Sequence, residues 1–187
     1  MTPLRSAAAA ALLLFLPSTA FAGMKLDTSI AKPKVGFKAN GEPGALDIDA
    51  KTEALTVADD GTNLTFTVDM NTVKTGIDLR DEHLRSKFLH TETHPHAVLS
   101  FAKAAIAWPT EVGQKANGTL EAQFTAKSIT KPIKMTYEVQ KTKQGWKCTG
   151  SFDYNTNDHG IEVPNYLGIT VDAKQSAKAV LYLVDAP

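Results

Sequence analysis

Residues 75–89 read TGIDLRDEHLRSKFL, the one stretch in which an otherwise strand-like chain becomes charged and helical. Asp78 is expected to be the N-cap, with Asp81 three positions later as its capping partner at the positive end of the helix. The apolar residues fall near one side and form a stripe: Leu79, Leu84 and Phe88 or Leu89. The sequence therefore predicts one short helix, from Asp78 to about Leu89, that docks on a sheet or covers its edge.

The N-terminal 22 residues have the composition of a secretory signal peptide. Met1–Arg5 is a short n-region with one cation, Ala7–Leu16 is apolar but too short to span a bilayer, and Ala20-Phe21-Ala22 gives a small-x-small cleavage pattern. Cleavage after Ala22 leaves residues 23–187, which fit one domain. We expect a periplasmic or secreted protein, and a chain with no cysteine just after the cleavage site is not expected to carry a stable membrane anchor.

Charge and cysteine content narrow the function further. Lys and Arg together number 20 and so do Asp and Glu, which indicates neither a nucleic-acid partner nor a membrane surface. Cys148 is the single cysteine, so no intrachain disulfide forms and packing must stabilise the fold. No cofactor is predicted, and a homodimer is left open.

Most of the chain outside the helix alternates apolar and polar residues with period two, as half-buried strands do. Leu55 and Val57 lead into the turn Asp59-Asp60-Gly61, and residues 64–70 return, which predicts a hairpin with one apolar face. Similar alternation runs through residues 46–50, 99–101, 120–126, 133–139, 146–152 and 177–184.

Seven or eight strands with one helix predict an all-β, antiparallel sheet that must hide its edges. Closure into an eight-stranded barrel removes the edges, and a β-sandwich is the alternative with the same strand count. The barrel is favoured by small residues on the presumed inward faces, where a filled sandwich core would hold larger ones: Ala122, Ala126, Ala177 and Ala179.

Several motifs together resemble one known family. They are Thr75-Gly76, RDEHLRS at residues 80–86, Phe88, His94-Pro95 and the strand end Ser100-Phe101. In this order they resemble the central signature of the YceI-like family, and RDEHLRS is a specific seven-residue match. The resemblance extends over most of the mature chain through two further segments: Thr130-Lys131-Pro132, expected between two strands, and Asp158, Gly160 and Ile161.

The resemblance implies an extended lipocalin-like antiparallel barrel, usually exported, that holds polyisoprenoids or other long-chain apolar lipids. Four positions depart from the family pattern. The first strand, Pro33–Phe37, lacks the usual histidine, His90 replaces an acidic residue, Thr156 stands where arginine is common, and His159 replaces a phenylalanine. These departures bear on ligand identity and on the barrel mouth more than on the fold.

Such a ligand would be held by inward-facing residues of the strands. Each methylene of an isoprenoid contributes about 0.8 kcal/mol when buried, so a dry lumen can bind one without polar contacts. The candidate lining residues, for which ordinary core packing is the alternative, are Phe66, Val68, Met70, Phe101, Phe124, Met135, Tyr137, Phe152 and Leu181.

The charged helix has two interpretations. Arg80, His83 and Arg85 are candidate contacts for a polar head group at the barrel mouth. Alternatively, Arg80, Asp81 and His83 form a hydrogen-bonded network that joins the helix to the sheet, which we favour because buried polar groups are normally satisfied internally.

Two other classes of function compete with lipid binding. His90, His94 and His96 are ligand types that Zn or Cu would take, so a metal-handling periplasmic protein is one alternative. A stress or interaction module whose barrel is filled by its own side chains is the other. The chain has no G-x-S-x-G, H-E-x-x-H or phosphate-binding glycine loop, and Cys148 lies on a strand, so an enzyme is not expected.

Overall fold

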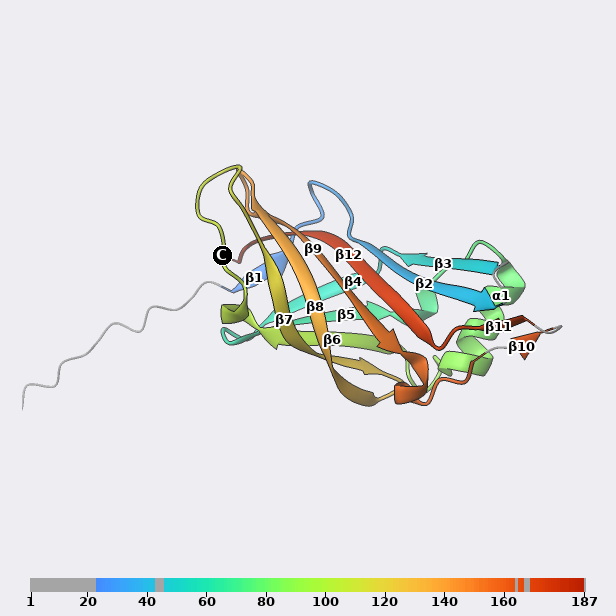
Figure 1. Ribbon diagram of the computed structural model, residues 1–187. Coiled ribbons are helices and arrows are strands. Elements are labelled where there is room, and N and C mark those ends of the chain that lie inside the picture. The colour runs from blue at the N-terminus through green and yellow to red at the C-terminus, as the bar shows by residue number, and fades with distance from the viewer. Residues whose placement is uncertain (1–22, 43–45, 164, 167–168, 187) are drawn as a thin grey trace, which may run out of the picture.

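The computed structural model describes residues 23–42, 46–163, 165–166 and 169–186, so the predicted signal peptide at residues 1–22 lies outside the described part. The described chain forms a twelve-stranded antiparallel sheet that curls into a nearly closed barrel (Figure 1). The predicted all-β barrel is therefore confirmed. Eight strands follow one another around the wall in the order β2-β12-β9-β8-β7-β6-β5-β4. The other four are β3, which matches the alternation at residues 46–50, and the short β1, β10 and β11.

The elements follow one another as strands broken by short helical turns. The strands are β1 (Met24–Leu26), β2 (Lys34–Glu42), β3 (Leu46–Thr52), β4 (Leu55–Asp59), β5 (Asn63–Asp69), β6 (His96–Ala102), β7 (Lys115–Ala126), β8 (Ile129–Lys141), β9 (Trp146–Asn155), β10 (Asn165–Tyr166), β11 (Ile169–Val171) and β12 (Lys174–Asp185). The helical segments are η1 (Met70–Thr72), α1 (Asp78–His83), η2 (Leu84–Leu89), η3 (Lys103–Ala105) and η4 (Thr156–His159).

The hairpin of β4 and β5 shows how alternation produces the barrel wall. Leu64, Phe66 and Val68 are 0 %, 9 % and 8 % exposed, and the threonines between them are half-buried. The predicted turn is confirmed. Gly61 has a φ of 88°, and Asp60 accepts hydrogen bonds from the backbone N–H groups of Thr62 and Asn63. One face of this hairpin therefore packs into the barrel interior.

The turn between β7 and β8 lies earlier than predicted. Lys127 and Ser128 form it, with φ values of 46° and 62°, because a two-residue hairpin turn that matches the strand twist needs positive φ at both positions. Thr130-Lys131-Pro132 was expected between two strands, but it lies inside β8, where Pro132 is opposite Gln123. The motif occurs in the sequence where the family resemblance places it, but it lies within a strand and not in a turn.

The predicted helix spans the expected residues, with two corrections. It runs as α1 and continues as the π-helix η2 to Leu89. Asp78 is not the N-cap, because Ile77 has the extended backbone of that position and Asp78 already lies in the first turn. Leu79 does not join the apolar stripe and is 61 % exposed. Leu84, Phe88 and Leu89 pack against the core as predicted.

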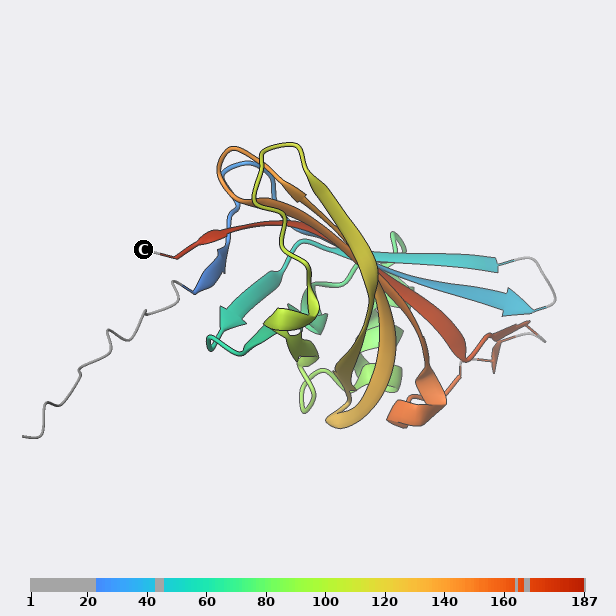
Figure 2. The same ribbon diagram turned by 60° about the vertical axis from the view of Figure 1, so that its left-hand side comes forward.

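The two ends of the barrel are built differently. β2 and β3 extend as an arm beyond the wall, on the side where α1, β10 and β11 also lie (Figures 1 and 2). At the other end β1 pairs with β12 and contacts β4. Among the described residues, no helix is long and apolar enough to cross a membrane.

Candidate ligand-binding lumen

The barrel encloses an apolar cavity of about 90 Å³. Its wall comes from β2, β4, β5, β6, β7, β8, β9 and β12, and apolar side chains make up nearly all of it. Given about 10–15 Å³ for each water-sized group, this space holds roughly six to nine such groups. The lumen is therefore neither plugged solid nor a wide channel.

The sequence-predicted lining residues can be compared with this wall. Eight of the nine lie on it: Phe66, Val68, Phe101, Phe124, Met135, Tyr137, Phe152 and Leu181. Met70 is buried but is not among the residues of the wall. Met70 lies beyond the end of β5, where Asp69 accepts a hydrogen bond from the Asn71 N–H and starts the turn η1.

Several inward-facing side chains keep some exposure, which marks the free space inside. Phe37, Tyr137, Phe152 and Ala179 line the cavity yet are only half-buried. A close-packed core would bury such residues completely. These four positions therefore border the part of the lumen that side chains leave unfilled.

A loop that the sequence did not single out covers one end of the cavity. Ile106 and Trp108 lie on the wall, and Trp108 Nε1 donates to the Lys103 carbonyl at 3.0 Å. Trp108 also packs edge-on against Trp146, with 5.6 Å between ring centroids. Trp146 Nε1 donates to the Pro109 carbonyl at 2.9 Å, which fixes the loop over this end. Residues in a loop carry no periodic pattern, so alternation could not reveal Trp108.

An aromatic cluster stands at the other end. His159 is 1 % exposed, and its ring lies 5.0 Å from that of Phe124, edge to face. Its Nδ1 is 2.9 Å from the Ile129 carbonyl oxygen. Tyr154 donates its hydroxyl to Gln175 Oε1 at 3.0 Å, and burial raises the pKa of Tyr154. His159, a departure from the family pattern, is therefore a buried residue packed within this aromatic cluster.

Few polar side chains line the cavity, and Lys178 is the one charged residue that the described part of the chain contributes to its wall. Burial raises the pKa of the Cys148 thiol to about 12, so the thiol stays protonated at neutral pH. Tyr137 accepts a hydrogen bond from the Ala107 N–H at 3.4 Å. This lumen suits an apolar molecule.

The charged side chains of the helix make local contacts. Arg80 Nη2 donates to the Thr75 carbonyl at 2.7 Å, and the buried Asp81 accepts from the Thr75 N–H at 2.7 Å. His83 Nε2 lies 3.1 Å from Lys87 Nζ. Neither these residues nor Arg85 line the cavity. The contacts of Arg80 and Asp81 match the structural alternative, whereas His83 lies outside that network.

The three histidines of the metal hypothesis do not form a metal-binding group. Within the described part of the chain, no three His, Cys, Asp or Glu side chains are placed to hold one ion. His94 Nδ1 lies 2.8 Å from Ser128 Oγ, while His90 and His96 are exposed. His90 ends the helix with a φ of 50°, so its backbone serves the turn.

An antiparallel barrel around an apolar lumen places the chain among the β-barrel proteins that contain an internal cavity. A sequence model of the YceI-like domain family matches residues 24–180, and the chain belongs to this family. The family resemblance predicted from RDEHLRS is thereby confirmed.

Solved structures share the fold. A polyisoprenoid binding domain from Saccharophagus degradans, implicated in plant cell wall breakdown, aligns with a TM-score of 0.70 and 16 % identity over 88 % of this chain and 99 % of that one. BcnA of Burkholderia cenocepacia aligns with a TM-score of 0.64 and 15 % identity, over 84 % and 99 % of the two chains. No curated protein sequence matches this chain.

Proposed function

We propose that the protein binds one long apolar lipid of the polyisoprenoid class inside the barrel and carries it in the cell envelope after export. The observation that supports this most is the apolar lumen, whose wall has almost no polar surface. The Saccharophagus degradans domain of the same fold is described as polyisoprenoid binding. The signal-peptide composition of residues 1–22 supports the envelope location.

The size of the lumen sets a condition on binding. A space of about 90 Å³ takes only a short part of a long chain, so the wall must widen around the rest. Met135 is flexible, and Phe37 and Phe152 are half-buried beside free space, so these three side chains can move. Each buried methylene contributes about 0.8 kcal/mol, which offsets the cost of moving them.

The test compares the lipid content of a lumen-filling variant with that of a matched surface variant. Ala179 lines the cavity on β12, so Ala179→Phe places a ring in the lumen. Lys147 is exposed on β9, so Lys147→Phe adds the same ring outside. Each protein is expressed in bacterial cells, purified from the envelope fraction, extracted with organic solvent and analysed by mass spectrometry.

The wild type and Lys147→Phe should each yield about one lipid per protein, and Ala179→Phe should yield much less. Circular dichroism and tryptophan fluorescence establish that the variants are folded. Empty wild-type protein from every preparation, or equal lipid in a folded Ala179→Phe protein, would contradict the proposal.

The helix arginines remain our candidates for a polar head group. Arg80 Nε and Arg85 Nη1 are buried and have no hydrogen-bond partner within the described part of the chain. A phosphate oxygen could accept from them. Arg85→Met should weaken binding of an isoprenyl phosphate about tenfold and leave an uncharged isoprenol unaffected, while equal losses for both would remove Arg85 from the site.

A further inference from the structure

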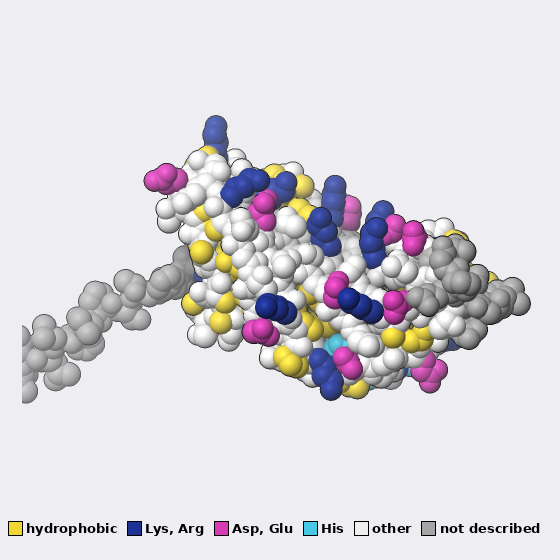
Figure 3. Space-filling model, in the orientation of Figure 1, with side chains coloured by type: hydrophobic (Ala, Val, Ile, Leu, Met, Phe, Trp, Pro, Cys, Tyr) yellow, Lys and Arg dark blue, Asp and Glu magenta, His cyan; other side chains and the backbone are white. Residues whose placement is uncertain are grey.

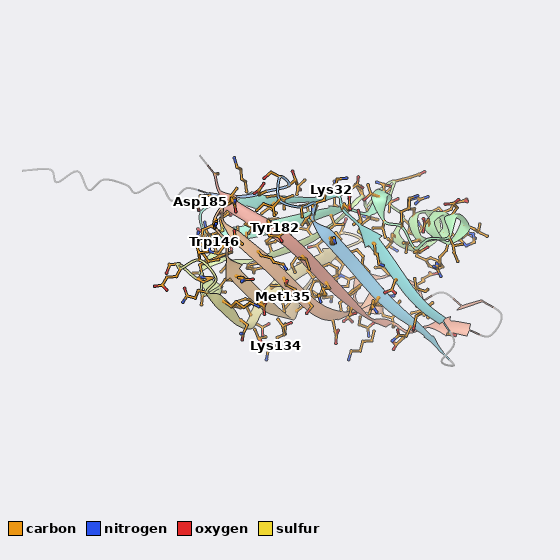
Figure 4. The ribbon with its side chains drawn as sticks, turned by 90° about the horizontal axis from the view of Figure 1, so that it is seen from above. Lys32, Lys134, Met135, Trp146, Tyr182 and Asp185 are labelled. Carbon is orange, nitrogen blue, oxygen red and sulfur yellow. The ribbon has the colours of Figure 1, made fainter. Side chains whose placement is uncertain are left out.

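A second, larger hollow of about 1450 Å³ lies along the sheet beside the lumen. It crosses β8, β9, β12, β2 and β3, which lie side by side, and reaches the segment at residues 72–74 (Figure 4). The arm of β2 and β3 projects from the barrel (Figure 2). The hollow adjoins the lumen, because five residues line both: Val35, Phe37, Phe152, Ala177 and Lys178. The residues that alternate with the apolar ones, such as Lys34 and Lys38 on β2, form its polar face.

Lysines dominate the charge of the hollow. Six lysines and three acids line it: Lys34, Lys38, Lys51, Lys74, Lys134 and Lys178, with Asp49, Glu53 and Asp153. Each acid already has a lysine partner, in the pairs Lys38–Asp49 at 3.4 Å, Lys32–Glu53 at 3.1 Å and Lys174–Asp153 at 3.6 Å. Figure 3 shows Lys and Arg side chains beside Asp and Glu side chains over β9 and β12. The chain is neutral as a whole, but this face carries a net positive charge.

The sheet register brings unpaired cations close together. Lys51 and Lys178 lie directly opposite Gly36, one on each side, so their Cα atoms are about 10 Å apart at the usual strand spacing. Neither has an ion-pair partner among the described residues. Gly36 has no side chain to separate them. Two lysines about 10 Å apart without acidic partners repel each other, so their arrangement suits an anionic partner.

Two exposed apolar side chains follow Lys74 along the chain, and Lys74 itself pairs with Asp81 at 3.7 Å. Lys74 pairs with Lys51 through two backbone hydrogen bonds of 2.8 and 2.9 Å, so the segment leading into α1 continues the edge of the hollow. Ile77 and Leu79 follow it and are 54 % and 61 % exposed. Large apolar side chains next to clustered lysines are typical of surfaces that lie on anionic membranes.

We infer that this face docks reversibly on an anionic bilayer surface, with lysines on the lipid head groups and Ile77 and Leu79 at the acyl boundary. A small soluble anion would make no use of the two apolar side chains. A second copy docked face to face would bring two positive surfaces together. The inference does not require lipid in the lumen, so it can fail while the proposed function holds.

The test measures partitioning of the purified protein onto vesicles. One set contains 30 % phosphatidylglycerol in phosphatidylcholine and the other pure phosphatidylcholine. The first variant combines Lys34→Glu, Lys51→Glu and Lys178→Glu. The control combines three exposed lysines from elsewhere, Lys25→Glu, Lys143→Glu and Lys147→Glu, with the same charge change. A third variant, Ile77→Ser with Leu79→Ser, keeps every charge.

Wild type should bind the anionic vesicles, should not bind the neutral ones, and should dissociate as salt is raised. The variant with Lys34, Lys51 and Lys178 replaced should bind anionic vesicles at least a hundredfold more weakly than wild type, because each lysine lost costs about fivefold in affinity. The affinity of the control variant should fall less than fivefold. The serine variant should bind about tenfold more weakly with unchanged salt dependence. Equal binding to both vesicles, equal losses in the two lysine variants, or a dimer by light scattering that only the hollow variant abolishes would overturn the inference.

Discussion

Replacing Asp59 with asparagine should destabilise the protein, because this carboxylate joins three parts of the chain. Asp59 Oδ2 accepts from Lys103 Nζ at 2.6 Å and from the Met24 N–H at 2.7 Å, and Oδ1 accepts from the Gly61 N–H at 2.8 Å. The Asp59 and Lys103 side chains are 1 % and 13 % exposed. The group therefore connects β1 and β4 to the segment that begins the loop over the lumen.

The expected loss follows from this burial. Removing one partner of a buried ion pair typically costs about 3–5 kcal/mol, since the other charge is left without compensation. For a chain of this size that corresponds to a fall in melting temperature of roughly 6–20 °C. Glu138→Gln is the matched control, because Glu138 pairs with Lys115 at 3.3 Å with both side chains about half exposed. Exposed pairs contribute at most about 1 kcal/mol.

Urea denaturation followed by the fluorescence of Trp108 and Trp146 measures both variants. Trp108 packs in the loop that begins at Lys103, so its fluorescence reports on the region around the Asp59–Lys103 ion pair. If Asp59→Asn costs no more than Glu138→Gln, the argument that burial makes this ion pair important is wrong. A double variant with Lys103→Met should recover part of the loss, because it removes the uncompensated charge.

The same group predicts a pH dependence. Burial by itself raises the pKa of Asp59, but hydrogen bonds from Lys103 and from the Met24 and Gly61 amides outweigh it and hold the pKa below its usual value. A carboxyl whose pKa is lower in the folded state stabilises the protein fully above its unfolded pKa of about 4. That contribution is lost as the pH falls through the folded pKa. The wild type should therefore lose more stability than Asp59→Asn between pH 5 and strongly acidic pH.

Three further predictions concern packing and reactivity. Gly145→Ala should lower the free energy of unfolding by about 3 kcal/mol in urea titrations, because the added Cβ would overlap the Leu183 carbonyl oxygen; a neutral result would show that the backbone yields there. Leu183→Ala, at 1 % exposure, should cost about 2–5 kcal/mol, against less than about 0.5 for Val112→Ala at 64 %; similar losses would contradict the burial argument. Cys148 should resist iodoacetamide at pH 8 in the folded protein and react in urea, since burial raises its pKa to about 12; fast labelling without urea would refute this.

Local patterns in the sequence predicted much of the architecture. The hairpin around Asp59-Asp60-Gly61 follows from alternation and turn chemistry, both of which act between near neighbours. The helical span to Leu89 follows in the same way. Alternation also predicted most of the candidate residues that lie on the lumen wall, because successive side chains on a strand point to opposite faces. Met70 lies outside this wall, because the turn η1 begins there and β5 has already ended.

The sequence by itself determined the alternating strands, the turn after β4 and the one helix, because period and turn chemistry are local properties. Only the tertiary structure decided between a barrel and a sandwich, since closure depends on how distant strands pair, and only it placed Trp108 on the lumen wall and gathered the lysines. Gly36, Lys51 and Lys178 are far apart in the chain and meet because strand order and register bring them together. The neutral total charge gives no sign of this lysine-rich face, because the local electrostatic potential depends on where charges lie in space and composition does not record that.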